Sequence, residues 1–381
     1  MNFELSEEQQ MVRASVREFA QAEIAPRARE YDENEKFPAE QIAGLAELGL
    51  LGMIIPEEYG GAGFDSVSYA LALEEIARAD ASVAVIVSVT NSVCCYPILK
   101  FGTEEQKRKY LEPLAKGEKL GAFCLSEPHA GSDATNLKTR AVENGDVFII
   151  NGTKSWVTNG GFADTHIVMA VTGEGDGRKE ISAFIVEKET EGLQVSSVEH
   201  KLGQRASQTT ELSFTDVAVP KENLLGKRGE GMKVAFGSLD NGRIGIAALS
   251  VGIAQAAFDE ALRYAKDRVA FGKPIAEHQA IQTKLADMAT GIEAARLLTL
   301  RAAAMKDADH KQTGIYASMA KLFASETANK VCAEAIQIHG GNGYSRHYNV
   351  EKYYRDARIT TIYEGTSEIQ RIVISRGILK D

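Results

Sequence analysis

The chain is organised around the stretch Ile359-Thr360-Thr361-Ile362-Tyr363-Glu364-Gly365-Thr366-Ser367-Glu368-Ile369-Gln370-Arg371, which places Glu364 between an apolar approach and a helix start. Gly365 permits unusual backbone torsions, and Thr366 or Ser367 can cap the helix. One face of that helix is expected to bury Ile369, Ile372, Val373 and Leu379. Apolar neighbours raise the pKa of a carboxyl group by desolvation, so Glu364 suits a general base near neutral pH. The alternative is an exposed acid favoured by the helix dipole.

Length and composition describe a globular protein of two or three domains. The chain has 381 residues, of which 44% are hydrophobic and 25% charged, and this length exceeds one ordinary core. The formal net charge of -10 argues against a nucleic-acid or anionic-membrane binder, because both surfaces would repel the protein. The N-terminal segment 1–8 is acidic and unlike a secretory signal or a transit peptide, so a cytoplasmic protein is expected.

The cysteines and one uncharged segment narrow the class further. No Cys-x-x-Cys pair and no histidine spacing typical of zinc accompanies the four cysteines, so we expect no metal site and a reducing compartment. Residues 81–99 carry no charge, but their Ser, Thr, Asn and Pro residues are too polar for a membrane span. A buried helix is the prediction for this segment.

Hydrophobic periodicity divides the chain into three regions. Residues 1–120 have helical patterns, beginning with the capping box Ser6-Glu7-Glu8-Gln9. Residues 121–230 have strand patterns, and Asn151-Gly152 is expected to form the tight turn of a hairpin. Residues 231–381 return to long helices with apolar faces. The expected fold class is α+β multidomain, with an N-terminal α-helical domain, a middle β domain and a C-terminal four-helix bundle.

The segment from Ile362 to Arg371 closely resembles the signature of the acyl-CoA dehydrogenases, in which the Glu of Tyr-Glu-Gly-Thr removes the α-proton of an acyl thioester. The order of an α domain, a β domain and a helical bundle is also that family's architecture. The resemblance implies an FAD-dependent enzyme that converts a short- to medium-chain acyl-CoA to a trans-2-enoyl-CoA, with Glu364 as the base. The segment 239–246 and the last signature are most similar to short-chain enzymes such as butyryl-CoA dehydrogenase.

Two motifs of the middle region are similar to the family's flavin site. Phe123-Cys124-Leu125-Ser126-Glu127-Pro128-His129-Ala130-Gly131-Ser132-Asp133 alone is only a tight loop, but the resemblance places Leu125 and Ser126 at the isoalloxazine ring. Trp156 alone could be a core residue. In the family this Trp lies against the flavin, and the resemblance implies that the Thr158 hydroxyl hydrogen-bonds the ring nitrogen that accepts hydride.

Leu239-Asp240-Asn241-Gly242-Arg243 is expected to open the third region with a flexible turn. It is either a helix N-terminus with an acidic cap or, by the resemblance, a wall of the acyl-CoA site in which Asp240 and Arg243 contact the CoA arm. Some relatives carry their catalytic Glu in this neighbourhood. Because this chain has Gly242 here, the resemblance favours Glu364 as the base.

Two further segments resemble the binding site for the dinucleotide end of FAD. An arginine suits a pyrophosphate because its planar fork donates several hydrogen bonds at once, and Arg268 and Gln279 take this role in the resemblance. In full, the resemblance assigns FAD to Phe123, Leu125, Ser126, Ser132, Trp156, Val157, Thr158, Arg268, Phe271, Gln279, Gln337, Gly340, Gly341, Thr366 and Glu368. It assigns the substrate to Ser132, Asp240, Arg243 and Gly365.

The resemblance implies partners as well. An electron-transfer flavoprotein would accept the electrons, and a homotetramer would share FAD between subunits. An acyl-CoA oxidase that reacts with oxygen is one rival hypothesis, which the lack of an added C-terminal domain disfavours. A flavin-binding member of the same fold that no longer dehydrogenates is the other, and the intact base and the negative charge weigh against it. The length and branching of the acyl chain stay open.

Overall fold

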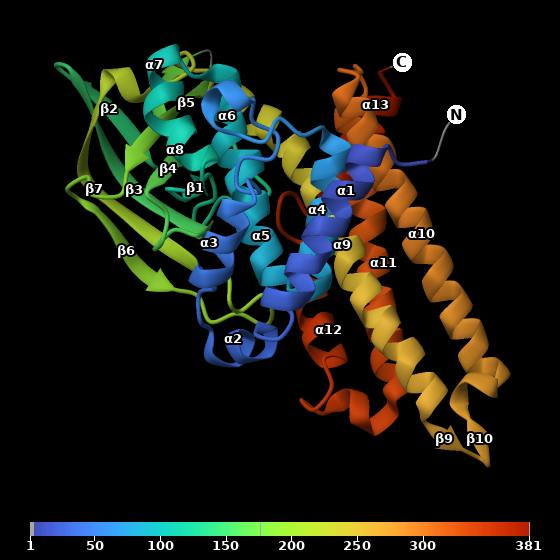
Figure 1. Cartoon of the computed structure of the whole chain (residues 1–381). Coiled ribbons are helices and arrows are strands. Elements are labelled where there is room, and N and C mark those ends of the chain that lie inside the picture. Colours follow the sequence, from blue (N-terminus) through green and yellow to red (C-terminus); the bar gives the residue numbers. More distant parts are fainter. Residues whose placement is uncertain (1–3, 176, 381) are drawn as a thin grey trace.

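The N-terminal helices lie between a β domain and a set of long C-terminal helices (Figure 1). This computed structural model describes residues 4–175 and 177–380, so the first three residues of the acidic N-terminal segment lie outside it. The observed order of helical, β and helical regions confirms the predicted fold class.

The N-terminal region begins at the predicted capping box. Ser6 Oγ accepts a hydrogen bond from the Gln9 amide at 3.2 Å, and Gln9 Oε1 accepts one from the Ser6 amide at 3.0 Å, which confirms that prediction. The helices are α1 (Glu7–Phe19), α2 (Ala28–Asn34), α3 (Ala39–Glu47), α4 (Ser66–Ala79), α5 (Ala81–Val89), α6 (Tyr96–Phe101), α7 (Glu104–Gln106) and α8 (Glu112–Ala115).

The uncharged segment is a buried helix, as predicted. α5 continues through a π-helical stretch, Thr90–Cys95, into α6. Within the described residues, two helices are long and apolar enough to cross a membrane: the continuous helix Ala81–Phe101 and α9 (Gly231–Asp267). Most residues of both helices are buried inside the protein. Burial of this kind is typical of the core helix of a large domain.

The β domain is a sheet with both faces covered. Its strand order is β6-β7-β3-β2-β4-β5-β8, and β1 pairs in parallel with β4. In β4, Ile167 and Met169 pack toward the N-terminal helices, whereas Val168 and Ala170 pack into the other core cluster, as alternating side chains must. The strands are β1 (Gly121–Cys124), β2 (Arg140–Asn144), β3 (Val147–Thr158), β4 (Thr165–Gly175), β5 (Arg178–Glu187), β6 (Leu193–Val198), β7 (Thr209–Pro220) and β8 (Leu224–Leu225).

The predicted hairpin turn at Asn151-Gly152 is wrong. β3 runs through both residues and pairs with β7, with register shifts on either side of the segment 152–154. A Cβ added at Gly152 would overlap Thr139, so this glycine allows a close approach of two backbones and does not form a turn. The turn that precedes β3 contains Gly145, whose φ is +56°.

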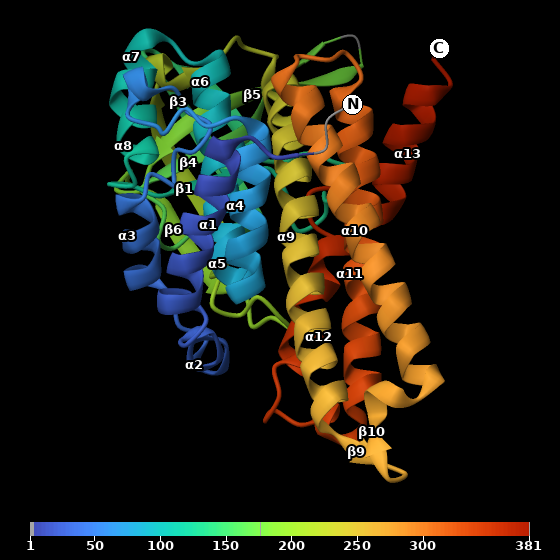
Figure 2. The same ribbon diagram turned by 45° about the vertical axis from the view of Figure 1, so that its right-hand side comes forward.

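α9 is the central helix of the C-terminal region, because it packs against α4, α5, α10 and α11. Figure 2 shows α9, α10 and α11 as long neighbouring columns, with α13 at one end and the β9–β10 ribbon at the other. The remaining elements are β9 (Val269–Ala270), β10 (Lys273–Pro274), α10 (Gln279–Asp307), α11 (Thr313–His339), α12 (Val350–Arg358) and α13 (Ser367–Ile378).

Two sequence-based expectations about these helices are wrong. The segment 239–243 lies inside α9 and forms no flexible turn. The Arg243 Nη1 to Asp240 Oδ1 ion pair of 2.8 Å joins residues three positions apart, an arrangement that supports a helix. On α13, Ile369 and Val373 are half-buried, but Ile372 is 41% exposed and Leu379, just after the helix, is 82% exposed, so this chain covers the apolar face only in part.

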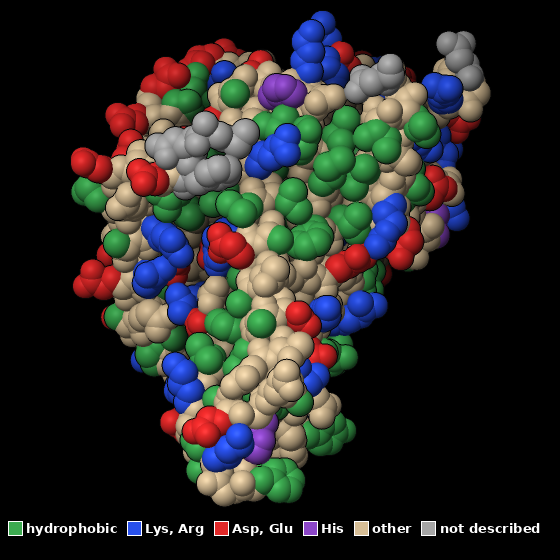
Figure 3. Space-filling view, turned by 90° about the vertical axis from the view of Figure 1, so that its right-hand side faces the viewer, with side chains coloured by type: hydrophobic (Ala, Val, Ile, Leu, Met, Phe, Trp, Pro, Cys, Tyr) green, Lys and Arg blue, Asp and Glu red, His purple; other side chains and the backbone are tan. Residues whose placement is uncertain are grey.

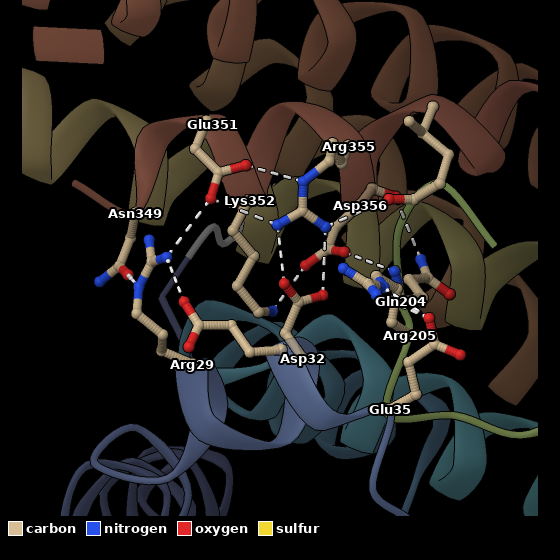
Figure 4. Close-up of polar contacts among 12 residues, drawn as sticks. Arg29, Asp32, Glu35, Gln204, Arg205, Asn349, Glu351, Lys352, Arg355 and Asp356 are labelled. Carbon is tan, nitrogen blue, oxygen red and sulfur yellow. Dashed lines mark hydrogen bonds and ion pairs between the residues drawn. The ribbon is translucent and has the colours of Figure 1, made fainter. Parts of the chain in front are cut away.

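Buried charges fix α12, which leads toward Glu364 (Figure 4). Arg355 donates from Nη2 to Asp32 Oδ2 at 2.7 Å, which ties α12 to α2. Lys352, also buried, donates to Asp356 at 2.7 Å. Gln204, in the loop before β7, donates from Nε2 to the Tyr363 hydroxyl at 3.2 Å. Breaking a buried ion pair typically costs about 3–5 kcal/mol, so α12 is held firmly, and the bond from Gln204 holds Tyr363, the residue next to Glu364.

Candidate active site

Glu364 lies in a left-handed turn between η8 (Ile359–Thr361) and α13. Its φ is +52° and that of Gly365 is +93°. The αL conformation is unfavourable for a residue with a Cβ, so the surrounding contacts must hold it. Thr366 Oγ1 caps α13 by accepting from the Ile369 amide at 3.3 Å, which identifies Thr366 as the capping residue. The turn therefore sets the carboxylate at a defined place before the helix.

Two side chains hold the carbonyl groups of this turn. Lys321, on α11, donates from Nζ to the Gly365 carbonyl at 2.8 Å. Gln370, on α13, donates from Nε2 to the same carbonyl at 2.9 Å and to the Glu364 carbonyl at 3.1 Å. Both side chains are buried. They compensate for the strain of the left-handed backbone by satisfying its acceptors.

The Glu364 carboxylate lies directly over the backbone of α9 at Gly242. A Cβ added at Gly242 would overlap Glu364 Oε2. Any residue other than glycine at this position would therefore displace the carboxylate. The absence of a side chain at Gly242 creates the space that Glu364 occupies.

The electrostatics of Glu364 suit a base. Burial raises the pKa of its carboxyl to about 7, although the cations of Lys321 and Arg243 act in the opposite direction. Oε2 is inaccessible to solvent and has no hydrogen-bond partner among the described residues. A carboxylate near pH 7 with an unbound oxygen can accept a proton from a molecule placed beside it.

Other buried polar atoms next to Glu364 also lack partners within the described part of the chain. They are Arg243 Nε and Asn241 Nδ2 on α9, and Gln370 Oε1 and Ser367 Oγ on α13. Buried polar groups are usually satisfied, so their gathering in one place indicates a ligand site. The structure thus brings together Glu364, Gly365, Asp240 and Arg243, four of the residues assigned from the sequence.

The flavin motifs of the β domain meet at one buried ion pair. Lys154, on β3, donates from Nζ to Glu127 at 2.8 Å and to the Leu125 carbonyl at 3.0 Å. The next residue, Ser155, donates its amide to the Ser126 carbonyl at 2.9 Å. These bonds tie the loop after β1 to the strand that carries Trp156, so the two motifs form one surface.

The indole of Trp156 is 61% exposed, and its φ is +60°. A large apolar ring held outward by a left-handed backbone favours the ligand-binding interpretation over the core interpretation. Val157, by contrast, packs its side chain into the β core, so only its backbone is available to a ligand. Thr158 is half-buried at the end of β3, and Phe123 is half-buried against the helical cores.

The remaining assigned residues lie elsewhere. Ser132 is exposed in the loop after β1, and Glu368 is exposed in the first turn of α13. The predicted dinucleotide residues lie at the ribbon end of the long helices, where Phe271 is 96% exposed. Along α9, Gly242 and Arg268 are roughly 40 Å apart at 1.5 Å per residue. One chain therefore does not bring Arg268, Phe271, Gln279, Gln337, Gly340 and Gly341 to Glu364.

Sequence reasoning missed the residues that support Glu364. Lys321 and Gln370 lie in ordinary helical patterns. A lysine among the apolar residues of α11, in Ala320-Lys321-Leu322-Phe323-Ala324, is nevertheless a signal of a buried polar group. Two other contacts join segments that are distant in the sequence: the bond from Gln204 to Tyr363 and the ion pair of Lys154 with Glu127. No local pattern marks such pairs.

Comparison with known proteins identifies the family. The chain matches the family models for the acyl-CoA dehydrogenase N-terminal domain over residues 6–118, middle domain over 122–217 and C-terminal domain over 229–379. The short-chain specific acyl-CoA dehydrogenase of Clostridium acetobutylicum is 49% identical over 380 residues, which cover 100% of both chains. The structure of butyryl-CoA dehydrogenase from Megasphaera elsdenii has a TM-score of 0.97 and 46% identity, with 100% of both chains covered.

A second solved structure, described as the electron transferring flavoprotein of Acidaminococcus fermentans, contains a chain with a TM-score of 0.98 and 48% identity, again covering 100% of both chains. The present chain therefore belongs to the acyl-CoA dehydrogenase family. It is an FAD-dependent enzyme that dehydrogenates acyl-CoA. The oxidase and non-dehydrogenating hypotheses are not favoured by these relatives.

The residues present fit FAD. The exposed rings of Trp156 and Phe271 provide flat apolar surfaces on which a flavin and an adenine ring can stack, although in two regions that one chain does not bring together. Both residues lie in left-handed backbone conformations, at φ +60° and +52°, which turn the rings outward. Near Trp156, Asn159 Oδ1, Ser207 Oγ and Gln208 Oε1 are buried without partners among the described residues, and such atoms can serve a bound polar group.

Proposed function

We propose that this acyl-CoA dehydrogenase acts on short-chain acyl-CoA, of the butyryl-CoA class, with Glu364 as the base. The observation that carries the proposal is the Glu364 carboxylate, whose pKa is raised to about 7 and whose Oε2 is buried without a partner among the described residues. The names of the C. acetobutylicum and M. elsdenii relatives support a short acyl chain.

Packing behind the base also supports a short acyl chain. Beyond Gly242, α9 approaches α4 and α5 so closely that a Cβ added at Gly245 would lie 2.6 Å from both Ser88 Oγ and the Tyr69 hydroxyl. These two hydroxyl groups are 3.3 Å apart and buried. Close packing of helices leaves little depth for a long chain at this point.

The proposed reaction removes a proton and a hydride from neighbouring carbons. The Glu364 carboxylate takes the proton from the α-carbon, and bound FAD would supply the acceptor for the hydride that leaves the β-carbon. The amide of Glu364 donates to no other group in the described part of the chain, so it can stabilise the thioester oxygen as the α-proton leaves. Oε2 is inaccessible to solvent, and burial raises the pKa of the carboxyl to about 7, which matches neutral pH.

We predict that Glu364→Gln abolishes turnover while FAD and acyl-CoA still bind. The amide has nearly the same shape but no basic oxygen, and a positioned general base contributes about 10² to 10⁴-fold. Anaerobic stopped flow with butyryl-CoA would measure the bleaching of the flavin. The same assay with octanoyl-CoA would test the preference for short chains.

Glu105→Gln is the control for this experiment, since Glu105 is an exposed acid on α7 that belongs to neither the FAD nor the substrate residues. Flavin absorbance and ligand-induced spectral changes should persist in both variants. A Glu364→Gln enzyme that bleaches at nearly the wild-type rate would show that another group is the base.

Assembly, electron acceptor and cellular role are parts of the same proposal. We propose a cytoplasmic homotetramer that passes electrons to an electron-transfer flavoprotein during fatty-acid β-oxidation, with domain boundaries near residues 120 and 230. The description of the A. fermentans structure supports that acceptor. The distance between the two groups of FAD residues supports sharing between subunits, because the dinucleotide residues of one chain lie far from its own base.

A further inference from the structure

Lys321 is a buried cation beside the proposed base, and no assigned role explains it. Its side chain is completely buried, and its one hydrogen bond within the described residues is the 2.8 Å bond to the Gly365 carbonyl. A buried ammonium group is costly unless nearby groups stabilise its charge. Yet no carboxylate lies within 4.0 Å of Lys321 among the described residues, so the cation has no ion-pair partner of its own.

The other charges around Glu364 are already compensated. Arg243 pairs with Asp240 at 2.8 Å, and Arg371 pairs with Glu326 at 2.6 Å. Glu368 is exposed to solvent. The titratable and charged groups that interact with Glu364 or Lys321 from the surrounding elements are Tyr69 on α4, Arg243 on α9, Glu326 on α11, Tyr363 before the turn, and Glu368 on α13. Asp240 and Arg371 face the same groups as the ion-pair partners of Arg243 and Glu326.

The way Lys321 is bonded matters for a base. A lysine bonded directly to the carboxylate would occupy its lone pairs and make it a poor proton acceptor. Lys321 instead bonds to the carbonyl of the next residue, and Glu364 Oε2 stays without a partner in the described part of the chain. The positive charge acts on the carboxylate through space, and neither carboxylate oxygen is bonded to a group of the described residues.

We propose that Lys321 is the positioning residue of Glu364: it fixes the left-handed turn through the Gly365 carbonyl and places a positive charge beside the base without bonding its oxygen. This inference rests on the proposed role of Glu364. Burial lowers the pKa of Lys321 to about 8, so the amine keeps most of its charge near pH 7. The pKa of Glu364, already raised by burial, is held down first by Lys321 and then by Arg243.

The test separates the charge of Lys321 from its hydrogen bond. Lys321→Met removes both, whereas Gln370→Leu removes hydrogen bonds to the same turn without any change of charge. Lys321→Arg keeps the charge and is the conservative rescue. All three holoenzymes would be compared with wild type by the pH dependence of flavin bleaching with butyryl-CoA, and by infrared titration of the Glu364 carboxyl without substrate.

In Lys321→Met, we expect the pH midpoint of flavin bleaching and the pH midpoint of the infrared titration both to rise by roughly one unit. Loss of the positive charge raises the pKa of Glu364, because an opposite charge within about 4–6 Å typically moves a pKa by 1–3 units. Lys321→Arg should restore most of the shift. Gln370→Leu should lower the rate but leave the midpoint near that of wild type, because the charge remains.

The inference would be overturned if wild type and Lys321→Met had the same pH midpoints. It would also be overturned if Gln370→Leu shifted the midpoints as much as Lys321→Met does. In the infrared experiment, Glu364→Gln identifies the band of the Glu364 carboxyl, because the variant lacks that group. It also distinguishes the two proposals: if Glu364→Gln still turns over, the base is wrong, whereas an inactive Glu364→Gln with an unshifted Lys321→Met rejects only the role of Lys321.

Discussion

At the scale of single residues, Glu364 combines a strained backbone with a buried carboxyl group, and both features oppose stability. The carboxyl has a pKa of about 7 in the folded protein, compared with 4.5 for a free side chain. Between these values the folded state binds more protons than the unfolded state. The stability contributed by the protonated form is therefore present below about pH 4.5 and is lost as the pH rises through 7.

This linkage predicts that Glu364→Gln stabilises the substrate-free holoenzyme at pH 8. Glutamine resembles the neutral acid and escapes the cost of a buried charge, which is up to about 3 kcal/mol at about 1.4 kcal/mol per pKa unit. Thermal unfolding of both proteins at pH 5 and pH 8 would show a higher Tm for the variant, chiefly at pH 8. In Glu105→Gln, whose acid is exposed on α7, no such gain should occur. A Glu364→Gln protein less stable than wild type at pH 8 would contradict the argument.

Gly242 gives a second prediction at this scale. Gly242→Ala should reduce turnover by about 100-fold, because a base displaced by roughly 1 Å loses its alignment. Its new Cβ would occupy the place of Glu364 Oε2. The helix itself should not suffer, since alanine is favoured over glycine in a helix by up to about 1 kcal/mol.

The control is Gly237→Ala, in the same helix, where a Cβ would meet Phe101 at an ordinary 3.5 Å. Both variants gain helix propensity, but only Gly242→Ala moves the carboxylate. Steady-state assays with butyryl-CoA and thermal unfolding would be measured together. Equal activity in the two variants would mean that Glu364 can shift without cost.

At the scale of elements, local chemistry was predictable and long-range packing was not. The capping box at Ser6 and the Thr366 cap follow from side chains three residues from their partners. Asn151-Gly152 has the composition of a turn, but pairing of β3 with β7 overrides it. The segment 239–243 has turn-forming residues, yet tertiary packing of α9 against neighbouring helices such as α4 and α11 keeps it helical.

The candidate site shows the same division. Glu364, Asp240 and Arg243 could be assigned from the sequence because motifs carry them, and the structure brings them together. Lys321 and Gln370 could not, because their role depends on α11 and α13 meeting one turn. The apolar face of α13 was predicted to be buried, but within one chain Ile369 and Val373 are only half-buried and Ile372 is exposed, because no other element of the fold covers this face fully.

At the scale of the whole molecule, the exposed apolar face is the feature that one chain does not explain. Figure 3 shows hydrophobic side chains gathered in the upper half of the face that carries α10 and α13. The exposed apolar residues of these helices and of the adjoining α11 include Leu297, Phe323, Ile372, Ile378 and Leu379. Monomers rarely expose large contiguous apolar patches, and a helical bundle covers such a patch well with another copy of itself.

We therefore predict that Ile372→Asp lowers the oligomeric state. Burying an unpaired charge in an interface is strongly unfavourable, so the expected tetramer should dissociate at micromolar concentration and lose FAD, whose two groups of binding residues lie at separate places in one chain. Val142→Asp, on the similarly exposed strand β2 of the β domain, is the control and should leave the mass and the flavin unchanged. Light scattering would give the mass, and absorbance would give the FAD content per chain. A wild-type protein that is monomeric with full flavin content would refute the prediction, because all FAD contacts would then have to come from one chain.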